Sequence, residues 1–311
     1  MSRALITGIT GQDGWYLSEL LQAGGYEVFG LVTADDPAPD PPGATRLVGD
    51  MRDTASLSAA LSSCSPDVVF NLASISSVAD SWVNPELAAD INGLGTLRLL
   101  AALHSSGRPV RFVQASSAEI FGDAPAPQDE STPIHPVSPY GAAKALAHHA
   151  VSAYRSAGVW AAAAILYNHE SPRRPEKFVT RKITAAVARI AEGSDETLML
   201  GNLDARRDWG YARDYMQALV LMAGLEEPAD FVIATGVSHT VRDFVAAAFE
   251  HVGIADWESR VGSDPSFTRA TDASEQRGDA SKARRELGWA PTVEFAELVG
   301  LMVDADRAAL P

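Results

Sequence analysis

The sequence has little cysteine, little positive charge and no long apolar run. Cys64 is its single cysteine, which excludes an internal disulfide and a cysteine-rich metal site, and no metal site is expected. The 25 Lys and Arg residues are outnumbered by 40 Asp and Glu, so nucleic-acid and anionic-membrane partners are not expected. No stretch approaches the roughly 18 apolar residues of a membrane span, and the N-terminal apolar run is too short for a signal peptide. We expect a soluble, cytoplasmic protein.

Short apolar runs alternate with helical patterns along the first half of the chain. The 311 residues, 46% of them hydrophobic, can form one large domain or two moderate ones. The alternation predicts an α/β fold with a Rossmann-type, doubly wound parallel sheet. The expected strands are Ala4–Thr7, Glu27–Val32, Val68–Leu72, Val110–Gln114, Ala161–Tyr167 and Asp230–Ala234. The expected helices are Trp15–Ala23, Thr54–Leu61, Gly93–Leu103, Tyr140–Ala157, Ile183–Glu192 and Tyr211–Gly224.

A glycine-rich turn joins the first expected strand to the first helix. Its spacing is G-x-x-G-x-x-G, where most dehydrogenases have G-x-G-x-x-G. Glycine allows a tight turn here and lets backbone N–H groups at the helix N-terminus approach a pyrophosphate. The turn therefore predicts a dinucleotide site. The residues expected to form it are Gly8, Thr10, Gly11, Gln12, Asp13 and Gly14.

Two acids follow the second expected strand, where a carboxylate would accept hydrogen bonds from the adenosine ribose. Asp35 and Asp36 lie about twenty residues after the last glycine of the turn. No Lys or Arg occurs between Arg3 and Arg46 to neutralise a 2′-phosphate, so NAD is expected, with NADP as the alternative cofactor. The other interpretation is that both aspartates are ordinary loop residues. The residues expected along the rest of the cofactor cleft are Asp50, Met51, Leu72 and Ala73.

Tyr140 and Lys144 lie one helical turn apart on the same face of an expected helix. A phenol with a pKa near ~10 is a poor base at neutral pH, and a nearby ammonium group is expected to lower that pKa. Lys144 can also hydrogen-bond the nicotinamide ribose. Downstream of a dinucleotide turn, the pair predicts hydride transfer at an alcohol carbon, whereas elsewhere it would be an ordinary solvated helix face.

The strand that precedes this helix ends in further polar residues. Ser117 is the better candidate, and Ser116 the second, for a hydroxyl that binds the substrate oxygen. Glu119 is not needed for simple alcohol oxidation. A carboxylate there could take a proton from the carbon next to a new ketone and return it to a leaving hydroxyl. The alternative is that Glu119 is a loop acid or a helix cap.

These motifs resemble those of the extended short-chain dehydrogenase/reductase family, in the order Gly8, Gly11, Gly14, Ser117, Tyr140 and Lys144. Within it, the chain is similar to the GDP-mannose 4,6-dehydratases over nearly its whole length. The matching segments are Gly8–Gly14, Ser138–Lys144, Asn168–Arg174, Val179–Ile183 and Gly201–Gly210. The last three segments are the most specific to these dehydratases.

The resemblance implies a GDP-sugar substrate and an internal redox cycle. Tyr140 would take the proton of the sugar 4-hydroxyl while hydride leaves C4 for the cofactor. Glu119 would remove the C5 proton, water would leave C6 with help from Glu119 or Ser117, and hydride would return to C6. The product is a 4-keto-6-deoxy sugar. The residues implied in substrate binding are Asn168, Glu170, Arg173, Lys182, Asn202, Arg207, Arg269 and Asp272.

The resemblance also implies the organisation of the chain. Residues 1–167 and about 203–235 would form the dinucleotide-binding domain, and about 168–202 with 236–311 a smaller nucleotide-sugar-binding lobe. A homodimer is expected through the helices near Gly93–Leu103 and Tyr140–Ala157.

This chain departs from the family pattern at particular positions. Thr33–Asp36 and a short proline-rich loop stand where the family carries arginines that serve NADP and tetramer contacts. Ser117 replaces a threonine, and the family's Arg-Pro-x-Glu element reads Arg269–Asp272. Two other functions stay open: a nucleotide-sugar epimerase or 4-reductase on the same fold, and a catalytically silent nucleotide-binding protein. Silent proteins of this kind tend to lose the tyrosine or the lysine.

Overall fold

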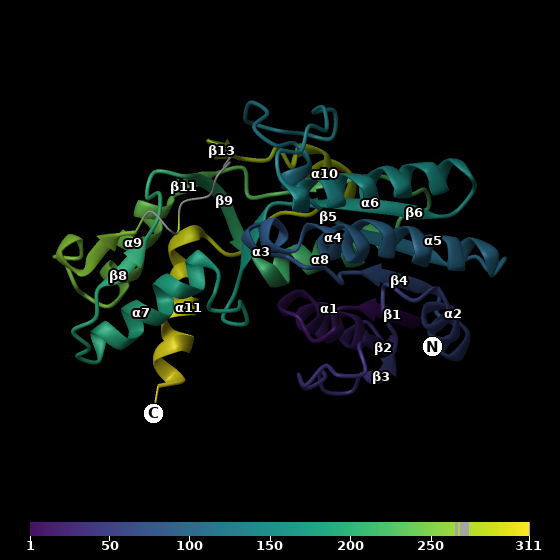
Figure 1. Cartoon of the computed structure of the whole chain (residues 1–311), viewed down its shortest axis with the longest axis horizontal. Helices are drawn as coiled ribbons and strands as arrows, with labels where there is room; N and C mark the ends of the chain where they lie inside the picture. Colours follow the sequence, from purple (N-terminus) through teal and green to yellow (C-terminus); the bar gives the residue numbers. More distant parts are fainter. Residues whose placement is uncertain (265–266, 268–273, 311) are drawn as a thin grey trace.

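The structure is a computed structural model that describes residues 1–264, 267 and 274–310. Figure 1 shows two parts lying side by side. The larger part contains the N-terminus. The smaller part contains α7 (Val179–Ala191), α9 (Val241–His251) and α11 (Phe295–Ala308).

The larger part is built on a seven-stranded parallel sheet. Its strands lie in the order β10 (Phe231–Ile233), β6 (Ala161–Leu166), β5 (Arg111–Ser117), β4 (Val68–Asn71), β1 (Arg3–Thr7), β2 (Glu27–Val32) and β3 (Thr45–Val48). The chain moves outward from β1 to β3 and then outward from β4 on the other side. A reversal of this kind opens a crevice at the carboxyl ends of β1 and β4. The predicted Rossmann-type fold is confirmed.

Helices cover both faces of this sheet. The apolar core on one face includes α1 (Gln12–Ala23), α8 (Ala212–Ala223) and α10 (Ser281–Leu287). On the other face the core includes α2 (Thr54–Cys64), α5 (Gly95–Ser105) and α6 (Pro139–Ser156). The run α3 (Val78–Val83), α4 (Pro85–Ala88) and a π-helical turn (Ala89–Leu94) leads into α5.

The smaller part has its own sheet and its own apolar core. β9 (Arg206–Tyr211) pairs with β7 (Asn168–Glu170), β11 (Ser238–Thr240) and β13 (Glu275–Gln276). β8 (Leu198–Leu200) pairs separately with β12 (Val261–Ser263), which follows a 3-10 turn at Glu258–Arg260. α7, α9 and α11 enclose the apolar side chains between them.

Several element boundaries differ from those predicted. β5 continues past Gln114 to Ser117, because its polar end still pairs with β6. α7 begins at Val179 rather than at Ile183. The expected turn-rich segment that ends at Asp208 contains the start of β9, and the edge strand β3 was not expected.

The division of the chain into two lobes stays a prediction. Within the segment 203–235, α8 and β10 pack on the larger sheet, whereas β9 belongs to the smaller sheet. Among the described residues, no helix combines the length and the apolarity that crossing a bilayer requires.

Gly14 lets α1 approach the sheet closely. A Cβ atom at this position would lie 2.3 Å from the backbone oxygen of Ile9. Because the contact is with a backbone atom, no side-chain rotation can relieve it. Ile9 itself is fully buried beneath the helix. The first helix is therefore held against the sheet by the absence of a side chain.

Gly14→Ala should lower the free energy of unfolding by about 2 to 3 kcal/mol, because the added methyl group overpacks the contact with Ile9. Urea denaturation of the two proteins measures the difference. Gly24→Ala is the matched control, since a Cβ atom there would lie no closer than 3.4 Å to another atom. Equal losses in the two variants would contradict the explanation.

Candidate active site

The crevice between β1 and β4 is shaped by hydrogen bonds of a buried threonine. Thr7 donates its hydroxyl proton to Asn71 at 2.6 Å, and its oxygen accepts from the backbone N–H groups of Leu72 at 3.1 Å and Ala73 at 3.0 Å. Gly8 has a φ of +71°, and a Cβ atom on it would lie 2.9 Å from the Ala73 nitrogen. Leu72 and Ala73 therefore lie directly beside the glycine turn, and their predicted contact with the cofactor stays a prediction.

The N-terminus of α1 is open to an anion. Gly11 is its N-cap and supplies no side chain to bond the first helical N–H groups. These groups carry the positive end of the helix dipole, which suits a pyrophosphate. The residues at this turn thus fit the dinucleotide that the sequence predicts.

Gln12 and Asp13 join this turn to the first strand of the smaller sheet. The side-chain amide of Gln12 donates to the His169 carbonyl at 3.1 Å, and its oxygen accepts from Ser171 at 2.7 Å. His169 lies with Nε2 3.0 Å from Asp13 and Nδ1 2.7 Å from the carbonyl of Tyr167. Both partners are acceptors, so both ring nitrogens donate and the imidazole is protonated.

The pKa values of this pair agree with the geometry. Burial alone would lower the pKa of His169, but the Asp13 carboxylate outweighs burial and raises it. Burial likewise pushes the pKa of Asp13 upward, and the charge and hydrogen bond of His169 reverse this, so that it is lowered. His169 was not singled out in the sequence, although it lies inside a segment that carried the resemblance.

At the adenosine end, Asp36 rather than Asp35 faces the glycine turn. Thr10 donates its hydroxyl proton to Asp36 at 2.8 Å, while Asp35 is exposed. Asp50 pairs with Arg52, and Met51 is buried under α5 against Gly95. Asp50 and Met51 thus lie beside the crevice with their side chains already in contact with protein.

Tyr140 and Lys144 project from the first turns of α6, which Ser138 caps through the backbone N–H of Gly141. Both side chains are buried. Lys144 donates to the carbonyl of Ala115 at 2.9 Å, and its Nζ lies 5.8 Å from the centre of the Tyr140 ring. The two groups are therefore held in fixed positions against the end of β5.

The expected lowering of the pKa of Tyr140 is wrong for this structure. Burial raises the pKa of Tyr140 to about 12, with a partial offset from a hydrogen bond to Ser117 and a further increase from the charge of Glu119. Burial also lowers the pKa of Lys144 to about 8. Desolvation is the largest cause of both shifts, because both groups lie away from water.

The two serines at the end of β5 point in different directions. Ser116 contacts His148 of α6 at 3.3 Å, whereas Ser117 contacts Tyr140 and accepts from the backbone N–H of Glu119 at 3.2 Å. Glu119 lies in the 3-10 turn Ala118–Ile120 that follows. The structure brings Ser117, Glu119 and Tyr140 together and takes Ser116 away from them.

Two expected substrate residues contact other parts of the protein, the buried Glu170 and the exposed Arg173. Glu170 is 2% exposed and accepts from the Thr180 hydroxyl at 2.6 Å, with Arg174 at 3.1 Å. Arg173 lies over the ring of Trp15 in α1, with its guanidinium carbon 3.9 Å from the ring centre. Arg174, which was not singled out, is the arginine whose charge reaches Asp13 and Tyr140. Its position four residues after the buried Glu170 is the signal that could have identified it.

The remaining expected substrate residues are spread over the smaller part. Lys182 lies with Nζ 3.4 Å from the centre of the Phe267 ring, and burial lowers its pKa. Asn202 is exposed and accepts from the backbone of Asp204, while Asn168 is half-buried in β7. Arg207 is buried in β9. The remaining two, Arg269 and Asp272, lie outside the described residues.

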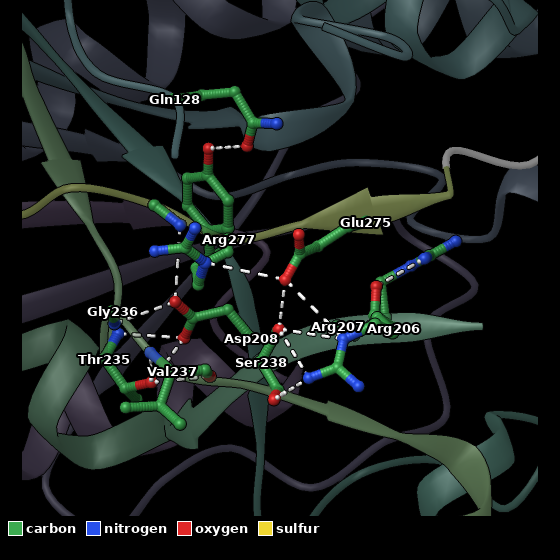
Figure 2. Close-up of polar contacts among 12 residues, drawn as sticks. Gln128, Arg206, Arg207, Asp208, Thr235, Gly236, Val237, Ser238, Glu275 and Arg277 are labelled. Atoms are coloured by element: carbon green, nitrogen blue, oxygen red, sulfur yellow. Dashed lines mark hydrogen bonds and ion pairs between the residues drawn. The ribbon is translucent and has the colours of Figure 1, made fainter. Parts of the chain in front are cut away.

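A buried carboxylate holds β9 in place (Figure 2). Asp208 accepts from the backbone N–H groups of Thr235 at 2.9 Å and Gly236 at 2.8 Å, and from the Thr235 hydroxyl at 2.6 Å. Gly278 donates to it as well, at 3.3 Å. Burial raises the pKa of Asp208 despite these donors. The cluster ties the end of β10 to the smaller sheet and so positions the neighbouring Arg207.

Comparison with known proteins identifies the family. The sequence profile described as GDP-mannose 4,6 dehydratase matches residues 5–302. The chain belongs to the GDP-mannose 4,6-dehydratase family. Its similarity to GDP-mannose 4,6 dehydratase 1 of Arabidopsis thaliana is 46% identity over 322 residues, which cover 97% of this chain and 89% of the relative. For the Homo sapiens GDP-mannose 4,6 dehydratase, identity is 43% over 337 residues, with 97% and 91% coverage.

Solved structures of related enzymes share the dehydratase fold. The UDP-glucose 4-epimerase of Thermus thermophilus, solved in complex with NAD, is 30% identical, with a TM-score of 0.88 and coverage of 99% of this chain and 100% of that chain.

Within the part of the chain that the structure describes, no group of three His, Cys, Asp or Glu side chains is placed to hold a metal ion.

The Asp13–His169 pair should make stability depend on pH. Because the folded pKa of His169 is raised, its contribution is complete below the unfolded value of about 6.5 and is lost as the pH rises through the folded value. The folded pKa of Asp13 is lowered, so its contribution to the free energy of unfolding is complete above the unfolded pKa of 3.8. That contribution is lost as the pH falls through the folded pKa of Asp13.

The unmodified protein should therefore exceed His169→Gln in free energy of unfolding by the largest amount between the unfolded pKa values of Asp13 and His169. The difference should decrease toward alkaline pH. Urea denaturation of both proteins across this range measures it. His104→Gln, at an exposed position near the end of α5, is the control and should follow the unmodified protein. A difference that is constant with pH would contradict the ion pair.

Proposed function

We propose that this dehydratase converts GDP-mannose, or a close GDP-sugar, to the 4-keto-6-deoxy sugar by internal hydride transfer from C4 to C6 with loss of water. The reaction makes it a hydro-lyase, with no net use of the cofactor. The observation that carries the proposal is the placement of Glu119 beside Tyr140 and Ser117. The named relatives from plants, animals and bacteria support the same reaction.

Each catalytic side chain has a distinct role in the proposed reaction. Ser117 binds the sugar 4-hydroxyl, and Tyr140 accepts its proton. A bound nicotinamide would supply the acceptor for the C4 hydride and its donor to C6, and its positive charge would favour the phenolate of Tyr140. A ketone at C4 acidifies the C5–H bond, so Glu119 removes that proton and then protonates the leaving C6 hydroxyl. When hydride reaches C6, C5 regains a proton from the solvent pool, which completes the 4-keto-6-deoxy product. Lys144, fixed by the Ala115 carbonyl, orients the nicotinamide ribose.

The cofactor is proposed to be NAD, with NADP as the alternative. The open N-terminus of α1 at Gly11 and the wall formed by Leu72 and Ala73 supply a cradle for its pyrophosphate and nicotinamide halves. Thr10, Gln12 and Asp13 complete the turn that would hold it. Of the two predicted acids, Asp36 is favoured over Asp35, since its carboxylate contacts this turn.

The GDP-sugar is proposed to lie between this site and the smaller part. Guanidinium and ammonium groups suit the diphosphate, and amide or carboxylate groups suit the base and sugar. The residues that keep this proposed role are Asn168, Lys182, Asn202, Arg207, Arg269 and Asp272. The contacts of Glu170 and Arg173 with other protein side chains favour a supporting role for these two residues.

We also propose a cytoplasmic location, because the GDP-sugar and the dinucleotide are both cytoplasmic metabolites.

An epimerase or a 4-reductase is not favoured. Neither reaction requires a carboxylate that removes the C5 proton and releases water, and the named relatives at 40–46% identity are dehydratases. Tyr140, Lys144, Ser117 and Glu119 are all present, which is unlike a silent binding protein.

We further propose a homodimer that forms through α5, α6 and the helices before them. Apolar side chains with exposed fractions of 38% to 76% occur there, and Leu146 of α6 packs against Gly93, next to Leu94. A second copy would remove this surface from water. The exposed residues are Trp82, Val83, Leu87, Leu94 and Leu146.

Glu119→Gln should reduce conversion of GDP-mannose by about 10²- to 10⁴-fold, since the amide cannot move the C5 proton. Mass spectrometry measures loss of one water, and deuterium uptake at C5 in D₂O measures proton removal. Asp129→Asn is the control, because its carboxylate accepts hydrogen bonds from Ser131 and Thr132 of its own turn. Unchanged GDP-mannose with the unmodified protein, or stoichiometric oxidation of reduced cofactor by a 4-keto sugar, would overturn the function.

The double change Leu94→Glu, Leu146→Glu should convert the dimer to a monomer at micromolar concentration, because it places charges in the apolar contact. Sedimentation velocity measures the mass. Leu301→Glu is the control, as this side chain is 41% exposed on α11, away from the proposed interface. A monomeric unmodified protein would refute the proposal.

A further inference from the structure

We propose that this chain selects NAD over NADP because Asp40 confines Arg46, and that releasing Arg46 would open the site to a 2′-phosphate. Arg46 is the single basic residue between Arg3 and Arg52. The inference rests on the dinucleotide-dependent function proposed above, and it assigns a role to a loop that differs from the family pattern.

The loop between β2 and β3 folds back onto the glycine turn. Asp36 accepts from the Thr10 hydroxyl at 2.8 Å and from the backbone N–H of Ala38 at 2.9 Å. A dinucleotide whose pyrophosphate lies on this turn places its adenosine ribose beside the end of β2. The Asp36 carboxylate is therefore available as an acceptor for ribose hydroxyls, as it retains unused lone pairs.

Arg46 reaches the same loop from β3, and each of its three guanidinium nitrogens already has a partner there. Its Nε lies 3.0 Å and 2.8 Å from the two carboxylate oxygens of Asp40. Nη1 donates to the carbonyl of Asp36 at 3.1 Å, and Nη2 donates to the carbonyl of Ala38 at 2.6 Å. All three nitrogens of the guanidinium group thus hold the loop, and the charge of Arg46 is matched by that of Asp40.

The charge that remains at this end of the crevice is negative. Residues 33–52 contain four aspartates, at positions 35, 36, 40 and 50, and two arginines. Arg52 is matched by Asp50, with contacts of 2.6 Å and 3.0 Å, just as Arg46 is matched by Asp40. Within residues 33–52, the charges of Asp35 and Asp36 are then not balanced by an arginine. A 2′-phosphate would meet these two carboxylates, and both arginines of residues 33–52 already have a carboxylate partner, which disfavours NADP.

Isothermal titration calorimetry of the full-length protein with NAD⁺ and with NADP⁺ tests the proposal without relying on turnover. The unmodified protein should bind NAD⁺ at least about tenfold more tightly than NADP⁺. Asp40→Asn should raise affinity for NADP⁺ about tenfold and change affinity for NAD⁺ by less than about threefold. Retained NAD⁺ binding also shows that the variant is folded.

Two further variants separate the roles of the pair. Adding Arg46→Ala to Asp40→Asn should remove the gain in NADP⁺ affinity, because the released cation is then absent. Glu27→Gln is the matched control. It removes the carboxylate that pairs with Arg3 at 3.0 Å, at the opposite end of β2. It should leave both affinities unchanged.

The outcomes distinguish the inference from the function on which it rests. Tighter binding of NADP⁺ by the unmodified protein, an unchanged preference in Asp40→Asn, or a gain that survives Arg46→Ala each overturns the inference while dehydration of GDP-mannose continues. Failure of both dinucleotides to bind overturns the proposed function together with the inference.

Discussion

The structure depends on the doubly hydrogen-bonded imidazolium of His169. One ring nitrogen donates to Asp13 of the glycine turn and the other to the chain between β6 and β7. The ring also stacks on Tyr215 of α8, with the two centres 5.0 Å apart. A protonated ring at this point fixes the glycine turn, the first strand of the smaller sheet and a core helix relative to one another. The position of the glycine turn relative to the smaller sheet follows from that arrangement.

The fold and the catalytic residues could be predicted because each has a local signal. Strand–helix alternation and the glycine turn follow from short-range patterns, and Tyr140 and Lys144 share a helix face at fixed spacing. Residues whose role depends on distant partners could not be assigned in this way. Asp36 and Asp35 are equivalent in the sequence, and only the folded loop directs Asp36 toward Thr10. The adjacent Arg173 and Arg174 likewise separate because Trp15 and Glu170 bind them from different elements.

Burial has the largest effect on the protonation of the catalytic pair. The sequence suggests that an ammonium group near a phenol will favour the phenolate, and in water it would. In the folded protein both Tyr140 and Lys144 are buried, and desolvation moves their pKa values toward the neutral forms, to about 12 and about 8. The site is thus built so that charge is favoured at Tyr140 only when further groups bind. The spacing of Tyr140 and Lys144 in the sequence predicts that they lie together, but it does not predict how far each side chain is exposed to water.

The Asp208 cluster has a consequence for how the molecule unfolds. The chain passes between the two parts repeatedly, from β6 to β7, from β9 to α8, from β10 to β11 and from β13 to α10, and Asp208 bonds the backbone at the last two of these passages. Separating the two parts therefore breaks the buried hydrogen bonds of Asp208, although each part has its own apolar core. The two parts are one cooperative unit, and slow hydrogen exchange in the strands of both should report the same global opening.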